Sequence, residues 1–198
     1  VQPVHRGIND IGTWKSALRA ADMGLRSKLY DLYEDILMDG TVTDAIGKRI
    51  EAITDCDINF TVNGKEVPRI TELIDTVEFE NQLKEIMWSL FWGISVDEYS
   101  FVNGFDFNSI PRKHIRPKEK LILRRQYDTD GISYSDDGMI IQWGEDDDLG
   151  LLLKVAPYVI YKRGGFGDWA QFVELFGMPQ RIGKYNSMDE QSRRLLIQ

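Results

Sequence analysis

Four consecutive carboxylates, Glu145–Asp148, are the densest group of potential metal ligands in the sequence. Mg²⁺ and Ca²⁺ are both bound through carboxylate oxygens, so a metal-dependent enzyme could be built around this run. Consecutive acids in a flexible loop rarely converge on one ion, however, and the spacing matches neither an EF-hand nor a Walker motif. We therefore expect a solvated acidic loop with no metal or cofactor, and the metal-dependent enzyme is the alternative function.

The other candidates for catalysis are isolated from one another. Asp97 and Glu98 are neighbours in a predicted strand, so their side chains point to opposite faces and cannot act as an acid–base pair. His5 lies near the start of the sequence, His114 lies in a predicted loop, and Cys56 is far from both. No CxxC or HExxH spacing supports a metal or nucleophilic site. We therefore expect no catalytic residue and no enzymatic activity.

Glycines in "RGGFGD", residues 163–168, resemble a phosphate-binding loop in composition only, because no strand-GxGxxG-helix or GK[ST] context surrounds them. We interpret the segment as a flexible hinge, after which Asp168 is predicted to cap a new helix with Gln171 in a capping-box position. Gly177 is predicted to end that helix in the left-handed conformation, and Pro179 prevents it from resuming. The chain would then run extended and be redirected at a fixed angle.

Aromatic residues recur at helical spacing in two places. Trp88 and Trp92 are four residues apart, and a second group follows at Trp169, Phe172, Val173 and Phe176. Stripes of this kind pack in the core of a chain or against another subunit, and the sequence leaves both possibilities open.

The spacing of apolar residues predicts helices followed by strands. One helix is predicted from Thr13, its N-cap, to Gly40, its stop, with a kink at Gly24. A strand is predicted over 94–102, and a loop over 103–117. The remaining predicted elements are a helix over 43–54, a hairpin over 58–67, one or two helices from Pro68 to Gly93, and short strands at "LILRRQY", "GISYS", "MIIQW" and "GLLLKV", the middle two joined by residues 136–138. This order predicts an α+β fold.

Composition narrows the class of protein further. The chain has 198 residues, 42% of them hydrophobic, and a net charge of -8, with all the acidic excess between Asp128 and Asp148. Tight binding to nucleic acid requires a basic face, so we expect none. A single cysteine and no long apolar run predict a reducing, soluble compartment and no membrane span. The sequence lacks an initiator Met and ends within a predicted helix, so we expect a fragment.

Several motifs resemble one family in the same order along the chain. "DWAQFVELFGMPQRIGKY", residues 168–185, closely resembles the W-x-x-F-x-E-x-F-G-x-P-x-R-x-G-K-Y signature of the portal proteins of Mu-like phages and prophages. "LYEDILMDGTVTDAIGKRIEAI" and "LFWGISVDEYSF" are similar to upstream patterns of that family. "IPRKHIRPKEKL" resembles the loop that follows, although its Arg-Pro-Lys departs from the Asp-Pro often found there.

The resemblance implies a structural protein of the virion. Portals form a homo-oligomeric ring, usually dodecameric, at the capsid vertex, where the head-tail connector begins. DNA is packaged and ejected through the ring, to which terminase and neck or tail proteins dock. Only transient, non-specific contact with double-stranded DNA in the channel is implied, and no membrane. The protein would be found in the virion, and in the bacterial host cytoplasm during assembly; a prophage-derived interaction module is a further alternative.

The resemblance also implies how the chain is divided. Residues 1–155 would form a portal wing-like α+β region with short antiparallel strands, and residues 156–198 a helical stem and the start of a clip-like region. The residues of the signature become the structural or interface candidates: Trp169, Phe172, Glu174, Phe176, Gly177, Pro179, Arg181, Gly183, Lys184 and Tyr185.

Overall fold

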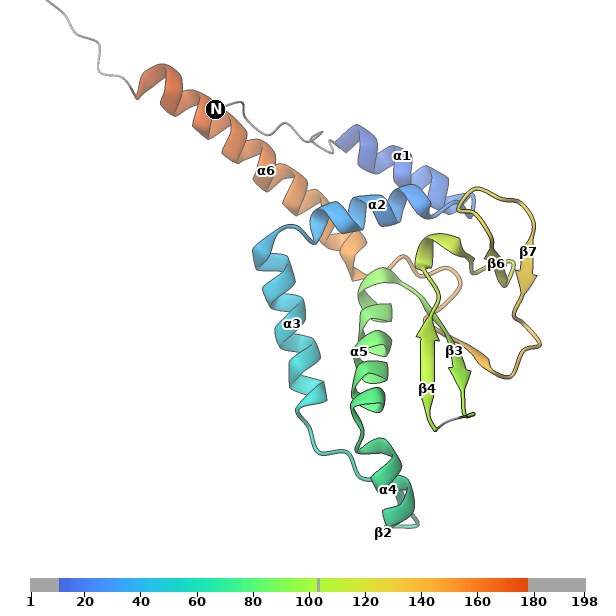
Figure 1. The fold of residues 1–198 in the computed structure, drawn as a ribbon. Helices are drawn as coiled ribbons and strands as arrows, with labels where there is room; N and C mark the ends of the chain where they lie inside the picture. Colours follow the sequence, from blue (N-terminus) through green and yellow to red (C-terminus); the bar gives the residue numbers. More distant parts are fainter. Residues whose placement is uncertain (1–10, 103, 178–198) are drawn as a thin grey trace, which may run out of the picture. The chain divides into compact units, whose positions relative to one another are not determined.

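The structure is a computed structural model that describes residues 11–102 and 104–177 (Figure 1). The chain divides into two compact units, Val1–Tyr161 and Lys162–Gln198. Its elements are α1 (Ile11–Asp22), α2 (Ser27–Ile36), α3 (Gly40–Thr54), β1 (Thr61–Val62), β2 (Lys65–Glu66), α4 (Pro68–Ile74), α5 (Val77–Trp92), β3 (Ser95–Ser100), β4 (Asp106–Ser109), the 3-10 turn η1 (Arg112–His114), β5 (Ile115–Arg116), β6 (Leu121–Leu123), β7 (Gly131–Ser133), β8 (Ile140–Trp143) and α6 (Leu151–Phe176). This mixture of helices and short antiparallel strands confirms the predicted α+β class.

The first predicted helix is two helices in the structure. α1 and α2 are separated at Gly24, which has a φ of +86° that an α-helix cannot accommodate. Thr13 as N-cap and Gly40 as a stop are wrong, since Thr13 lies inside α1 and Gly40 opens α3. The N-cap of α3 is Asp39, whose carboxylate accepts a hydrogen bond from the backbone N–H of Thr41 at 3.0 Å.

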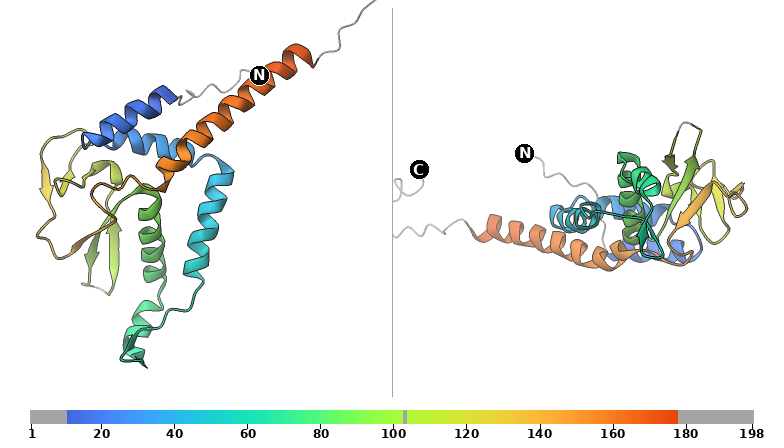
Figure 2. Two further views of the ribbon diagram at one scale, coloured as in Figure 1. Left: turned by 180° about the vertical axis from the view of Figure 1, so that it is seen from behind. Right: turned by 90° about the horizontal axis from the view of Figure 1, so that it is seen from below.

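The segment from α3 to α5 follows the predicted order. α3 and α5 run side by side in opposite directions, and the β1–β2 hairpin and α4 connect them (Figures 1 and 2). Asn63 and Gly64 have φ values of 52° and 75°, and two positive values are what a type I′ turn requires. Pro68 opens α4 and Gly93 ends α5, both as predicted, and Gly93 takes the left-handed conformation.

Two three-stranded antiparallel sheets lie after α5 in the sequence, with the strand orders β4-β3-β8 and β5-β6-β7. The prediction of a loop over 103–117 is wrong, because this segment contains β4, η1 and β5. β4 is a half-exposed edge strand of mostly polar residues, so its sequence gives little alternation to detect. β7 and β8 are adjacent in sequence but belong to different sheets, since β8 pairs with β3.

The segment "GLLLKV", predicted as a strand, is the end of a loop and the start of α6. Leu152, Ala156, Val159 and Ile160 are buried, and their spacing of three and four residues is that of one helix face. The helical period extends beyond the six residues on which the strand prediction was based. The prediction is therefore wrong because its window was too short.

Aromatic rings fill the centre of the first unit. Trp92 is buried between Tyr30 and Tyr33, with 5.7 Å between its ring centroid and each of theirs in edge-on geometry. Such pairs add roughly 0.5–1.5 kcal/mol beyond the apolar area that they bury. The rings join α2 to the end of α5, and the surrounding core includes Leu29, Ile36, Ile46, Ile50, Phe91, Ile94, Val96 and Leu152.

Three glycines hold the end of α5, the end of β8 and the start of α6 together within the first unit. Gly93, Gly144 and Gly150 have φ values of +89°, +93° and +77°. A Cβ atom on Gly93 would lie 2.8 Å from the backbone nitrogen of Gly150, and one on Gly150 would lie 2.6 Å from the carbonyl carbon of Trp92. Backbone atoms are the obstacles, so no rotamer change could make room for a side chain. We call these three residues the glycine junction.

Replacing Gly93 by Ala should lower the free energy of unfolding by more than about 2 kcal/mol, since the methyl group adds both left-handed strain and a backbone clash. Gly47→Ala is the control, because Gly47 lies inside α3 with nothing within 4 Å of its Cβ position. That change should raise stability by up to about 1 kcal/mol. Chemical denaturation followed by tryptophan fluorescence measures the free energy of unfolding of both variants. Equal values would mean that the backbone around Gly93 has room for a side chain.

Candidate functional site

A row of exposed aromatic side chains lies on the part of α6 that belongs to the second unit. Trp169 is 65% exposed and Phe176 is 69% exposed. The rings of Phe172 and Phe176 contact each other with 4.9 Å between their centroids. We call the following five residues the aromatic face: Phe166, Trp169, Phe172, Val173 and Phe176. These side chains do not pack in the core of the described chain, whereas Trp88 and Trp92 do.

A single helix positions the aromatic face. α6 runs without a break through residues 163–168, so the predicted hinge there and the predicted N-cap at Asp168 are wrong. Apolar residues recur every three or four positions from Phe166 onward, and the helical period outweighs the weak helix propensity of the glycines. The helix ends at Phe176 as expected, but Gly177 does not take the predicted left-handed conformation. Its N–H donates to the Val173 carbonyl at 2.7 Å, which extends the helical hydrogen-bond pattern.

The other signature residues divide into two groups. Glu174 is exposed on α6. Gly177 directly follows the helix. Five candidates and the extended segment predicted around them lie outside the described residues: Pro179, Arg181, Gly183, Lys184 and Tyr185.

The three aspartates of the acidic run Glu145–Asp148 direct their carboxylates to separate partners. These are Lys120 at 2.5 Å and Gln142 at 2.7 Å for Asp146, Lys118 at 2.8 Å for Asp147, and the Gly150 N–H at 2.8 Å for Asp148. The hydrogen bond from Lys120 lowers the pKa of Asp146 below its ordinary value. Among the described residues, no three His, Cys, Asp or Glu side chains come together to hold a metal ion. The run closes a loop instead of forming a ligand set.

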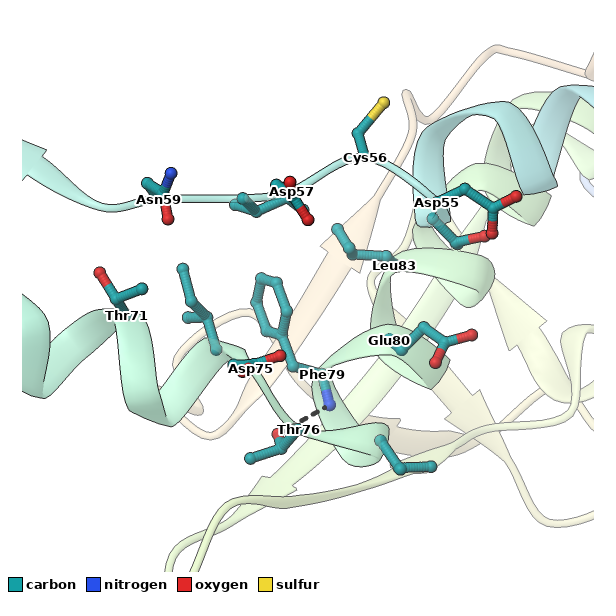
Figure 3. A pocket seen from close by; sticks show the side chains of 14 residues that line it. Asp55, Cys56, Asp57, Asn59, Thr71, Asp75, Thr76, Phe79, Glu80 and Leu83 are labelled. Carbon is teal, nitrogen blue, oxygen red and sulfur yellow. Dashed lines mark hydrogen bonds between the residues drawn. The ribbon is translucent and has the colours of Figure 1, made fainter.

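A second acidic surface lines an open pocket of about 470 Å³ between residues 54–59 and helices α4 and α5 (Figure 3). Phe79 and Leu83 point from α5 toward the extended segment, whereas the exposed Cys56 points away from them. The carboxylates around the pocket belong to Asp55, Asp57, Asp75 and Glu80. A pocket lined by acids and aliphatic side chains, with neither a lysine nor an arginine in its lining, does not favour phosphate ligands.

A buried polar cluster between α5 and the β3–β4 pair was missed by the sequence analysis. Asp97 is fully buried, and its carboxylate accepts hydrogen bonds from Ser109 Oγ at 2.6 Å and Gln82 Nε2 at 3.0 Å. Burial raises the pKa of Asp97, and the two hydrogen bonds oppose that rise. Beside it, the Arg112 guanidinium bonds Glu85, so the second carboxylate of the cluster is neutralised by an ion pair.

The cluster connects the helix layer to the sheet and lies under the surface, so it is suited to holding the fold together rather than to binding a substrate. Glu98 is exposed, which confirms that it and Asp97 point to opposite faces of β3. The sequence carries no signal for the buried carboxylate, because Ile94 and Val96 alternate with Ser95 and Asp97 as in a strand with only one covered face. In the structure residues 94–97 are all buried, so both faces are covered and the acid needs polar partners.

Asp97→Asn should make the stability of the protein less dependent on pH. Because its pKa is raised in the folded state, the contribution of Asp97 to stability is greatest at low pH and is lost as the pH rises through the folded-state pKa. Asn cannot ionise, yet it can accept from Ser109 and donate to the otherwise unpaired Oε1 of Gln82 after that amide turns over. The stability of the variant relative to wild type should rise from about pH 4 to about pH 8, by roughly 1.4 kcal/mol per unit of pKa shift.

Urea denaturation across this pH range measures the difference. Asp97→Leu is the control, since it leaves the Ser109 hydroxyl and the Gln82 amide buried without their partner. It should be roughly 1–3 kcal/mol less stable than Asp97→Asn at every pH in the range, because neither of the two new side chains ionises. A difference between Asp97→Asn and wild type that stays constant with pH would mean that Asp97 does not titrate differently on folding.

Comparison with models of protein families gives a match over most of the chain. A family model described as "Portal protein of Mu bacteriophage" matches residues 30–198, which includes most of α2, all of α3 to α6 and the whole aromatic face. None of the curated proteins compared with the chain matches it. Within the described residues, no helix has the length and apolar character needed to cross a membrane.

Proposed function

The chain belongs to the portal protein family of Mu-like phages, and we propose that it assembles with copies of itself into a ring at the capsid vertex. It is therefore a structural phage protein. Portal rings form the opening through which DNA enters and leaves the phage head. In this proposal, terminase docks on the ring during packaging, and neck and tail proteins attach to it afterwards.

The observation that supports assembly best is the exposure of the aromatic face. Its five apolar side chains lie on one side of α6, and each is at least 44% exposed in the isolated chain. Exposed clusters of large apolar residues usually mark protein–protein interfaces, and aromatic residues are enriched at the centre of such interfaces. The face thus has the composition of a subunit contact, and three of its five residues, Trp169, Phe172 and Phe176, are positions of the signature that resembles the family.

The predicted division of the chain gives each of its two regions a role in the ring. We propose that residues 1–155 form the wing-like region and residues 156–198 the stem and the start of the clip. Compaction into two units that meet between Tyr161 and Lys162 agrees with a change of role in this part of α6. The glycine junction, which fixes where α6 begins, would then fix where the stem leaves the wing.

DNA would pass through this ring without being held. The acidic excess of the chain opposes binding to phosphates, because tight non-specific binding requires a basic surface. A channel lined by many lysines or arginines would hold the DNA, so the charge balance favours sliding. The protein would belong to the virion, and to the host cytoplasm while heads are assembled.

Catalysis has no support beside this structural role. The acidic run proposed for a metal-dependent enzyme spreads its carboxylates over separate partners, and the family is structural. We therefore propose that the protein has no catalytic activity of its own.

Phe176→Ala should reduce assembly without changing the stability of the subunit. Its ring is 69% exposed, so the loss should cost less than about 0.5 kcal/mol in the isolated subunit. Tyr127→Ala is the matched control, because Tyr127 is equally exposed, at 68%, but lies in the first unit. Mass photometry over a concentration series should give at least about tenfold weaker assembly for Phe176→Ala, equivalent to 1.4 kcal/mol, and wild-type assembly for the control.

Two results would argue against this role of Phe176. If Phe176→Ala lowers the stability of the monomer by about 3–5 kcal/mol, the phenyl ring of Phe176 packs in a core. If Phe176→Ala and Tyr127→Ala both assemble like wild type, Phe176 does not contribute to the subunit contact.

A further inference from the structure

We propose that the aromatic face of one copy docks into an apolar groove on the first unit of the neighbouring copy. This inference rests on the ring assembly proposed above and names the second surface of the contact. The groove lies between α3, the end of α5 and the start of α6. We call it the α3 groove, and its apolar lining includes Val42, Ala45, Ile46, Phe91, Leu152 and Val155.

Ring symmetry requires that the aromatic face of one copy contact a surface of the next copy other than its aromatic face. Copies in a ring of more than two contact one another head to tail, so each copy contributes two distinct patches to its interfaces. A two-fold dimer would instead pack one aromatic face against the same face of its partner. An exposed apolar helix in a ring subunit therefore predicts a complementary apolar hollow elsewhere on the same chain.

The α3 groove has the chemistry and size for that role. Ala45 and Leu151 are exposed at its edge, whereas Ile46, Phe91 and Leu152 form its buried floor. Its volume of about 210 Å³ is below the usual range of roughly 300–1,000 Å³ for small-molecule sites. A hollow of this size and lining suits a large aromatic side chain better than it suits a cofactor.

Charge at the edge of the groove matches charge beside the aromatic face. Arg49 lines the groove, is exposed, and makes no ion pair within the described residues. Between Gly164 and Gly177, the ionisable side chains are Asp168 and Glu174, both acidic. Asp168 precedes Phe172 by four residues, so the two are neighbours on the helix surface. Docking the face would therefore bring Asp168 of one copy to Arg49 of the next.

Disulfide trapping tests this pairing of surfaces. In a Cys56→Ser background, Ala45→Cys places a thiol at the groove and Ala170→Cys places one beside Trp169, with every aromatic residue retained. Under mild oxidation, a mixture of the two single-cysteine proteins should give a covalent heterodimer. Neither protein alone should give a comparable yield.

The outcomes separate this inference from the proposed function. Assembly without the mixed cross-link, or with Ala170→Cys cross-linking to itself instead, would overturn the groove pairing and leave the ring intact. Absence of any assembly by mass photometry, for a chain that is folded by circular dichroism, would overturn the ring and this inference with it.

Exchanging the charges of Arg49 and Asp168 tests the same pairing of surfaces independently. Arg49→Asp and Asp168→Arg should each weaken assembly several-fold, and the double variant should recover most of the loss. Lys48→Asp is the control, because Lys48 is next to Arg49 on α3 but outside the groove lining, where it pairs with Asp44 at 2.7 Å. Equal effects of Lys48→Asp and Arg49→Asp, or no recovery in the double variant, would contradict the pairing.

Discussion

The backbone contact at the glycine junction is the constraint on which the first unit depends. Gly93 ends α5 and Gly150 comes just before α6, and neither position has room for a Cβ atom. The acidic run lies in the loop that connects β8 to α6. Within this loop, the Asp146 carboxylate accepts hydrogen bonds from Lys120 and Gln142, and the Asp148 carboxylate accepts one from the Gly150 N–H. Asp146 and Asp148 of the acidic run therefore contribute to the structure of this loop.

The start of α6 connects this junction to the surfaces proposed for assembly. Leu152 and Val155 line the α3 groove, and the same helix carries the aromatic face in the second unit. A subunit that closes into a ring needs two different surfaces. We propose the α3 groove, which has Arg49 at its edge, and the aromatic face, which has Asp168 beside it. Trp92 is buried between two tyrosines in the first unit, whereas Trp169 in the second unit is exposed.

Local signals in the sequence predicted the elements that depend on local chemistry. The β1–β2 hairpin follows from Asn63-Gly64, and the end of α5 follows from Gly93. Elements set by distant contacts were missed or misassigned. β8 pairs with β3 rather than with its sequence neighbour, and the partners of Asp97 come from a helix and another strand. The predicted joint in α6 failed because the helical period of the aromatic residues outweighed the glycines. The exposure of those residues could not be predicted, because the spacing of a buried stripe and of an interface stripe is the same.

Electron microscopy of the assembled protein tests the central claim most directly. A reconstruction should contain closed rings with a central channel, in which each Trp169 is buried against the α3 groove of the adjacent copy. Rings with Trp169 facing solvent would contradict the proposed contact. Particles that are monomers or two-fold dimers at every concentration at which the protein remains folded would contradict the portal assembly itself.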